Sequence, residues 1–175
     1  MRPFTIRPAC ATDAGALADL WVTARRARRE TAGTASGPVD PGDEGSIEAA
    51  RSEVDERLAD DGCVAVLAED DQGTAAMSVA VPARADDGAS PDLLPGLLHI
   101  SMVAVRPDRW GGGLGEVVLS VVQDEARRHG FTAAQLWTQD SNARGRRLYE
   151  RMGWKPSGRT KVDEGEAIGH YERVL

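Results

Sequence analysis

The sequence predicts one mixed α/β domain spanning residues 1–175, with strands and helices in the order βααβββαβαββ. Three observations support this fold class. The composition, 41% hydrophobic and 28% charged over 175 residues, suits one globular domain with a sizeable core. Short β-like runs are interspersed with stretches that have apolar residues at helical spacing. The sequence contains neither an internal repeat nor a linker between domains.

The N-terminal third predicts one strand and two helices. Residues 4–7 alternate in polarity, which is typical of a short strand. The first helix ends near residue 30, and one of its faces contains Leu17, Leu20, Trp21, Ala24 and Arg28. Residues 31–45 are rich in Gly, Pro, Thr and Asp, which predicts a loop. Ser46 then caps a second helix, whose apolar positions at helical spacing are Ile47, Ala50, Val54 and Leu58.

The rest of the chain predicts further strands and helices on either side of one apolar strand. Residues 63–69 and 75–82 are β-like and predict a hairpin. A polar loop with two prolines, residues 84–96, leads to a strongly apolar strand at residues 97–105, which we expect at the centre of the sheet. The expected elements after it are a helix that ends near residue 129, a strand at 133–138, a helix at 142–152 and a hairpin formed by 159–162 and 167–174.

Several classes of protein are excluded at this stage. No apolar run is long enough to span a bilayer, and the first residues lack the features of a signal peptide, so we expect a cytoplasmic protein with no membrane partner. The histidines have no metal-like spacing with one another or with the cysteines, so no metal site is expected. Cys10 and Cys63 are expected to be reduced and largely buried thiols, with a disulfide or a nucleophile as the alternatives.

The formal net charge of -7 is unevenly distributed along the chain. Residues 106–159 contain ten Lys/Arg and six Asp/Glu, whereas the rest of the chain contains 11 basic and 22 acidic residues. One basic segment in an acidic protein indicates either a local anion site or a solvated helix surface. It does not indicate nucleic acid, which requires a broad basic face.

A glycine-rich turn, residues 111–115, follows the apolar strand and precedes a helix. The first turn of a helix has unpaired N–H groups that favour negative charge, and glycines let a phosphate approach them. The turn therefore predicts a diphosphate site, with a purely structural turn as the alternative. A P-loop is disfavoured because Leu114, Gly115 and Glu116 stand where it needs Gly-Lys-Ser/Thr, and a dinucleotide fingerprint lacks its third glycine.

This stretch resembles the cofactor motif of the GNAT acetyltransferases, Arg/Gln-x-x-Gly-x-Gly/Ala after a strand. Gly113 and Gly115 match its two small positions, whereas Trp110 stands where the family usually has Arg or Gln and Arg109 is one residue early. Downstream, Asn142 and residues 147–154 are similar to the family pattern Asn…Ala-x-x-Leu-Tyr-x-x-x-Gly-Phe. The resemblance implies a GNAT-like domain, with a central, mixed but mostly antiparallel sheet flanked by helices, that uses acetyl-CoA as co-substrate.

The resemblance also implies which residues bind acetyl-CoA. The strand before the glycine turn carries a bulge in this family, and its backbone pairs with the pantetheine arm and can donate to the thioester carbonyl. The implied cofactor-binding residues are Val103, Ala104, Val105, Arg109, Trp110, Gly111, Gly112, Gly113, Leu114, Gly115, Glu116 and Asn142. Asn142 has a helix N-cap as its structural alternative. Candidates to meet the phosphates are Arg106, Arg109, Arg144 and Arg147.

Two residues are candidate catalytic groups. Tyr149 matches the general acid of the family, which protonates the departing thiolate, and its alternative is a core aromatic. His99 is the only titratable side chain on the central strand and is a candidate general base, with a water relay or a residue elsewhere as alternatives. Trp137 and Thr138 stand where the strands of the family splay apart, so they and the two long loops are expected to face the acceptor.

The predicted function is direct transfer of an acetyl group to an amine of a small molecule or peptide. The acidic remainder of the chain favours a cationic acceptor such as a polyamine, an aminoglycoside or lysine. Two alternatives from other classes stay open: a non-catalytic module of the same fold that binds acyl-CoA, and a nucleotide-binding oxidoreductase. Because many members of the superfamily dimerise, a homodimer is also expected.

Overall fold

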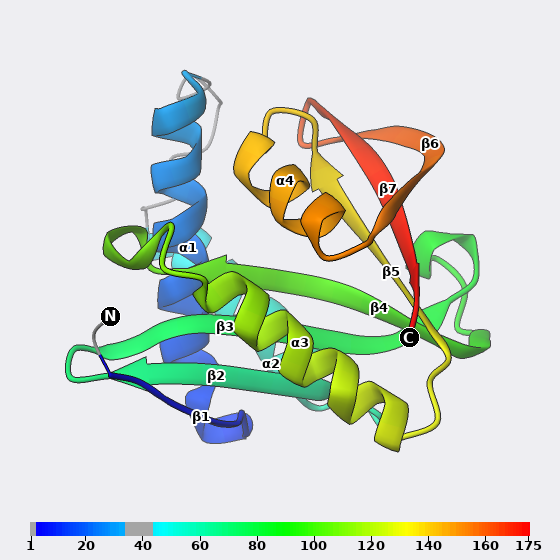
Figure 1. Ribbon diagram of the computed structural model, residues 1–175, viewed down its shortest axis with the longest axis horizontal. Coiled ribbons are helices and arrows are strands. Elements are labelled where there is room, and N and C mark those ends of the chain that lie inside the picture. The colour runs from blue at the N-terminus through cyan, green and yellow to red at the C-terminus, as the bar shows by residue number, and fades with distance from the viewer. Residues whose placement is uncertain (1–2, 34–43) are drawn as a thin grey trace.

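Residues 3–33 and 44–175 are described by a computed structural model, in which seven strands form one sheet (Figure 1). The strands are β1 (Thr5–Pro8), β2 (Val64–Asp70), β3 (Gly73–Arg84), β4 (Leu93–Val105), β5 (Ala133–Gln139), β6 (Lys155–Asp163) and β7 (Glu166–Val174). The helices are α1 (Ala14–Ala32), α2 (Glu44–Leu58), α3 (Leu114–Arg128) and α4 (Ala143–Arg151). These elements follow one another in the expected order.

The sheet order is β1-β2-β3-β4-β5-β7-β6, which confirms the central position of the apolar strand β4. Every neighbouring pair is antiparallel except β4 and β5, which are parallel. Parallel neighbours need a crossover connection, and α3 provides it between these two strands. The mixed, mostly antiparallel sheet is therefore confirmed.

Helices cover both faces of the sheet (Figure 1). On one face α1 and α2 pack through Leu17 and Val54 against Met77 of β3. On the other face α3 packs through Val118 and Val122, in a cluster that also contains Tyr149 of α4. Each helix buries one apolar stripe, as its sequence pattern predicts. The sheet is thus the middle of three layers.

A β-bulge at Ser101 changes which face of the sheet the residues of β4 point toward. Val79 of β3 pairs with Met102 and the next residue, Ala80, pairs with Ile100, so Ser101 is the extra residue. Ile100 lies in the core cluster beneath α3, whereas Met102 lies in the cluster beneath α1 and α2. The bulge expected from the family resemblance is therefore present, two residues before Val103.

The parallel pairing of β4 with β5 ends immediately before this bulge. Its last pair is Ile100 with Leu136, although both strands continue in the same direction. Beyond this point Trp137 and Thr138 of β5 no longer pair with β4. Backbone groups of β4 that face β5 are consequently free of a neighbouring strand, and a gap opens within the sheet.

Three expectations about element boundaries were wrong. The polar stretch at 84–96 was expected to be a loop, but β3 extends to Arg84 and β4 begins at Leu93; Pro95 is tolerated because β5 pairs only from Leu97. Strand β6 begins at Lys155 rather than residue 159, since an edge strand tolerates Pro156. The second helix begins at Glu44, so Ser46 lies in its first turn and does not cap it.

The two cysteines differ in how far they are exposed to solvent. Both cysteines are free, but Cys10 is exposed, so the expectation of two buried thiols was wrong for this residue. Cys63 is half-buried, and burial raises its pKa to about 11.

No described helix has the length and apolarity needed to cross a membrane. In the described part of the chain, no three His, Cys, Asp or Glu side chains are grouped as metal ligands.

Candidate active site

Two cavities meet at the gap between β4 and β5. The first cavity, of about 430 Å³, lies between α1, α4 and the outer half of β4. The second cavity, of about 680 Å³, lies between α2, the start of β4 and the β6–β7 hairpin. Both are lined by Trp21, Arg25, Ile100, Ser101, Trp137, Thr138 and Gln139. The bulge at Ser101 and the end of strand pairing therefore create a junction that two molecules can reach from different sides.

The glycine turn, residues 111–115, directly follows Trp110, which lines the first cavity. Gly111 and Gly113 have left-handed φ angles of 79° and 81°, which glycine adopts without strain, and Gly113 is the N-cap of α3. Open space surrounds the position of a Cβ at both residues. A Cβ at Gly115 would instead lie 3.0 Å from Cδ2 of Leu148. The turn thus combines an accessible helix N-terminus with close packing of α3 on α4, so the structural and ligand-binding interpretations are compatible.

The two residues before the turn have different environments. The buried guanidinium of Arg109 forms an ion pair with Asp70, which also accepts from Arg106 at 2.7 Å, so both arginines point away from the first cavity. Trp110 lines that cavity, and its Nε1 donates to the carbonyl of Val105 at 2.7 Å. The guanidinium of Arg144 lies 3.8 Å from the centre of the Trp110 ring. Trp110 therefore packs against an arginine of α4 at the wall of the first cavity.

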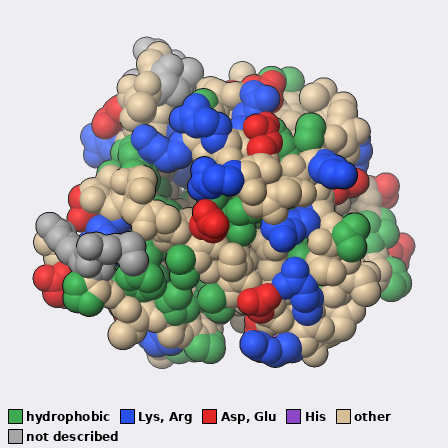
Figure 2. All heavy atoms as spheres, viewed as in Figure 1, with side chains coloured by type: hydrophobic (Ala, Val, Ile, Leu, Met, Phe, Trp, Pro, Cys, Tyr) green, Lys and Arg blue, Asp and Glu red, His purple; other side chains and the backbone are tan. Residues whose placement is uncertain are grey.

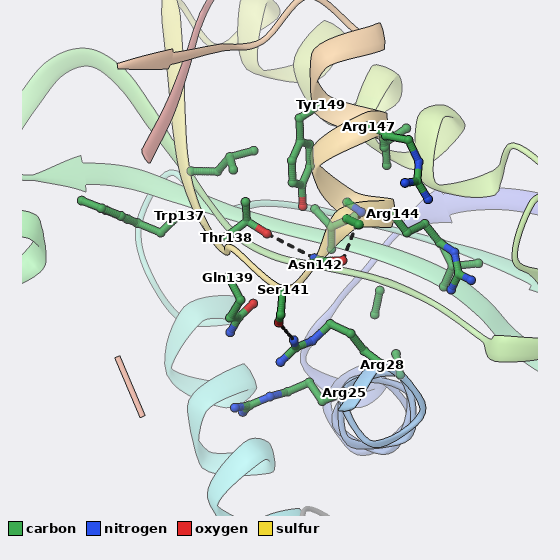
Figure 3. A pocket seen from close by; sticks show the side chains of 18 of the residues that line it. Arg25, Arg28, Trp137, Thr138, Gln139, Ser141, Asn142, Arg144, Arg147 and Tyr149 are labelled. Carbon is green, nitrogen blue, oxygen red and sulfur yellow. Dashed lines mark hydrogen bonds between the residues drawn. The ribbon is translucent and has the colours of Figure 1, made fainter. Parts of the chain in front are cut away.

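Among the described residues, four arginines line the first cavity, and none of its described lining residues is acidic. Arg144 and Arg147 extend from α4, whereas Arg25 and Arg28 extend from α1 (Figure 3). Lys and Arg side chains gather on this face of the molecule around α4 (Figure 2). Arg25 and Arg28 are paired with Glu164 and Glu166, whereas Arg144 and Arg147 have no ion pair among the described residues, so these two arginines favour an anionic ligand.

Sequence reasoning missed the two arginines of α1, although it contained a signal for one of them. Arg28 was placed on the apolar face of its helix, where a charged side chain requires an explanation. Arg28 donates to Oγ of Ser141 at 3.0 Å and lies 3.6 Å from the carboxylate of Glu166. Burial lowers the pKa of Arg28. Arg25 is bound to Glu164, so both side chains connect α1 to the C-terminal hairpin and its neighbouring loop.

Asn142 is the N-cap of α4. Its Oδ1 accepts from the backbone N–H of Gly145, and its Nδ2 donates to Oγ1 of Thr138, both at 3.1 Å. A Cβ at Gly145 would lie 2.4 Å from Nδ2, so only glycine leaves room for this cap. The amide thereby fixes the start of α4 to β5 at the edge of the first cavity. The structural alternative for Asn142 is thus realised.

Tyr149 lies on α4 with its hydroxyl directed toward Thr138 and Asn142 (Figure 3). The side chain is buried, and its ring packs against Trp154 and Tyr171, with centroids 6.2 Å and 6.1 Å away. Burial, followed by the nearby Tyr171, raises the pKa of Tyr149 to about 12. The phenol is therefore fully protonated at neutral pH and can act only as a donor of its proton.

His99 lines the second cavity and not the first. Its buried Nδ1 has no hydrogen-bond partner in the described part of the chain. Burial, and then the positive charges of Arg57, His170 and Lys161, lower the pKa of His99 to about 4. The imidazole is consequently neutral at pH 7. It can accept a proton, but it is a weaker base than an ordinary histidine.

The predicted site residues thus separate into two groups. Those that line the first cavity are Val103, Ala104, Val105, Trp110, Asn142 and Tyr149. Those outside it are Arg109, with its side chain on Asp70, His99 in the second cavity, and the turn from Gly111 to Glu116 at the start of α3. Of the two long loops, Thr31 lines the first cavity, and Arg84, Asp87 and Gly88 line the second, whereas residues 34–43 lie outside the described residues.

The described structure therefore has a sheet that opens between two parallel strands, next to a glycine turn and a basic cavity. Residues 38–154 match the model of the Acetyltransferase (GNAT) family. Because this match covers more than half of the sequence, the chain belongs to the GNAT acetyltransferases, and it is an acetyltransferase by family. The prediction of the family is confirmed.

Solved structures agree with this assignment. The chain is similar to yncA from Salmonella typhimurium with its cofactor acetyl-CoA, with a TM-score of 0.69 and 21% identity over 99% of this chain and 94% of that one. It is also similar to PaiA N-acetyltransferase from Thermoplasma acidophilum in complex with coenzyme A, with a TM-score of 0.69 and 12% identity over 99% of each chain. A third similar structure is the ribosomal-protein-S18-alanine N-acetyltransferase from Escherichia coli, with a TM-score of 0.66 and 19% identity over 98% of this chain and 94% of that one. These likenesses show the fold. No curated protein matches the sequence.

Proposed function

We propose that the protein transfers an acetyl group from acetyl-CoA directly to an amine. The observation that carries this proposal is the first cavity, where a buried phenol, the free backbone of β4 and four arginines surround one space at the gap in the sheet. The first and second cavities share a junction, so donor and acceptor can meet there without a covalent enzyme intermediate. Holding two reactants together supplies much of the acceleration in such a reaction.

The residues of the first cavity fit acetyl-CoA. Its phosphates would be met by arginines such as Arg144 and Arg147, and the glycine turn offers the N-terminus of α3 with open space around Gly111 and Gly113. The backbone of residues 103–105, which β5 leaves unpaired, is available to the pantetheine arm. When bound, acetyl-CoA would supply a thioester whose C–S bond breaks as the C–N bond of the product forms.

Tyr149 is the proposed general acid. Its pKa of about 12 keeps the hydroxyl protonated at neutral pH, and no hydrogen bond joins it to the described residues, so it is available to a departing thiolate. An N–H of β4 near Ala104 is the proposed donor to the carbonyl oxygen. Such a preorganised donor contributes about 3 kcal/mol.

His99 is the proposed acceptor of the proton that the amine loses, and a water relay through the second cavity is the alternative. His99 stays neutral at pH 7 because of its low pKa, so its ring is always available to accept. The same low pKa favours release of that proton to water at neutral pH. An amine acceptor and a homodimer belong to this proposal through the family resemblance. The cytoplasmic location expected from the sequence belongs to it as well.

The test combines binding with turnover. Acetyl-CoA at about 100 times its dissociation constant should stabilise the protein by about 2.7 kcal/mol, seen as a rise in Tm, whereas NADH should not. In parallel, thiol release is followed over a panel of amines. Release that depends on an amine supports the enzyme. A rise in Tm with no release for any amine would favour the non-catalytic acyl-CoA-binding module, and no rise would show that the glycine turn is only structural.

A further inference from the structure

Most charges that line the second cavity neutralise one another. Arg57 pairs with Glu53 at 2.9 Å, and Arg84 pairs with Asp60 at 2.8 Å. Two other lining carboxylates are bound as well, Glu164 to Arg25 and Asp87 to Arg159. These pairs leave little net charge for a ligand to recognise. The selectivity of the cavity therefore depends on the polar groups that have no protein partner.

Lys161 is the cation of the second cavity that has no carboxylate partner among the described residues. Its Nζ lies 4.4 Å from the centre of the Trp137 ring, at the wall that the two cavities share. An ammonium over an aromatic face is held in place while its other sides stay available to an anion. Lys161 and Arg57 both act on His99 electrostatically, so their positive charge reaches the interior of the cavity.

Buried hydrogen-bond donors line the same space. The Nε of Arg57 and the Nε1 of Trp21 are shielded from solvent and have no acceptor in the described part of the chain. Both atoms can only donate. Oγ of Ser101 and Nδ1 of His99 are also buried without partners. Because unsatisfied buried donors are costly, a ligand that brings oxygen acceptors would relieve this cost once these side chains turn toward the cavity that they line.

We propose that the acceptor is an amino acid, whose carboxylate faces Lys161 while its amine points toward the junction at Ser101. The proposal rests on the proposed function and specifies its acceptor. It differs from the polyamine or other purely cationic acceptor that the overall acidity of the sequence favours. Two lining carboxylates, Glu56 and Asp163, also have no ion pair among the described residues. Both are exposed, as Lys161 is, but only Lys161 of these three contacts the Trp137 ring at the wall that the two cavities share.

The experiment measures binding, so it does not depend on turnover. Isothermal titration of the CoA-saturated protein uses the twenty amino acids, the matched carboxamide and decarboxylated amine of each amino acid that binds, and spermidine. At least one amino acid should bind about tenfold more tightly than its carboxamide. Lys161→Met should remove that preference, whereas Lys155→Met, on the same strand but outside both cavities, should keep it.

Three results would overturn the inference: binding of no amino acid, equal affinity for acid and carboxamide, or an unchanged preference in Lys161→Met. Tighter binding of spermidine than of any amino acid would restore the cationic acceptor. If an amino acid binds with the expected preference but accepts no acetyl group from acetyl-CoA, the inference about the ligand stands and the proposed transfer fails.

Discussion

Replacing Tyr149 by Phe is the most direct test of the proposed chemistry. The substitution removes one hydroxyl and keeps the ring, which packs against Trp154 and Tyr171. Since that hydroxyl takes no hydrogen bond from the described residues, no protein group loses a partner, and stability and acetyl-CoA affinity should stay close to those of the wild type. Proton donation by a positioned group accelerates a reaction by at least about 10²-fold, so kcat should fall by at least that factor. This decrease corresponds to an activation barrier that is about 2.7 kcal/mol higher.

Steady-state thiol release with a productive amine measures this effect, and calorimetry measures acetyl-CoA affinity. Tyr171→Phe is a matched control, because Tyr171 is equally buried but lines neither cavity. Its hydroxyl accepts from Arg146 and donates to Glu150, both at 3.2 Å, so this variant should lose about 1 kcal/mol of stability and keep its kcat. A Tyr149→Phe enzyme with kcat within twofold of the wild type would refute the assignment of the general acid.

The pH dependence of kcat provides a second check on Tyr149. Its pKa of about 12 keeps the phenol protonated throughout the range in which the protein is assayed. We therefore expect no decrease in kcat between pH 7 and about pH 10 that depends on this side chain. An alkaline decrease that is present in the wild type and absent from Tyr149→Phe would show that the phenol ionises much earlier than its burial implies.

Three further predictions concern stability, measured by chemical denaturation. Gly115→Val should destabilise the protein by about 1–3 kcal/mol, because a Cβ there already lies 3.0 Å from Leu148; an unchanged stability would mean that α3 can shift away from α4. Asp70→Asn should lower the free energy of unfolding by about 3–5 kcal/mol, since it leaves buried arginine charge unbalanced. Asp124→Asn, which removes one partner of an exposed ion pair, should lower it by less than about 1 kcal/mol. Equal losses of stability in the two variants would contradict this reasoning. Between about pH 6.5 and pH 4 the unfolded state binds more protons at His99 than the folded state does. The free energy of unfolding should therefore decrease by about 3 kcal/mol as the pH falls through this range, and His99→Phe should abolish that contribution. An identical pH dependence in the variant would exclude His99 as its source.

Local sequence patterns were sufficient for most of the fold. Alternation and helical spacing predicted each strand and helix, and the long apolar run predicted the central strand β4. The errors occurred where pairing with another strand overrides local composition. Pro156 argues against a strand when read alone, yet β6 includes it, because the outer edge of a sheet does not require its N–H group.

The candidate site was predicted less completely than the fold. The motifs identified Trp110, Asn142 and Tyr149, and the structure brings these residues to one cavity with the end of β4. They also suggested Arg109, whose guanidinium is bound to Asp70 instead. Charge counting along the chain cannot distinguish these cases, since an arginine is free for a ligand only if no carboxylate from elsewhere in the sequence neutralises it.

The sequence by itself determined where the backbone turns and what each helix and strand buries. The glycines at 111 and 113, which adopt left-handed φ angles without strain, and the apolar run of β4 can be read directly from the residues. The tertiary structure alone decided which charges face a cavity and how firmly His99 and Tyr149 hold their protons. Those properties depend on burial and on charges brought close from distant parts of the chain, such as Arg57 beside His99.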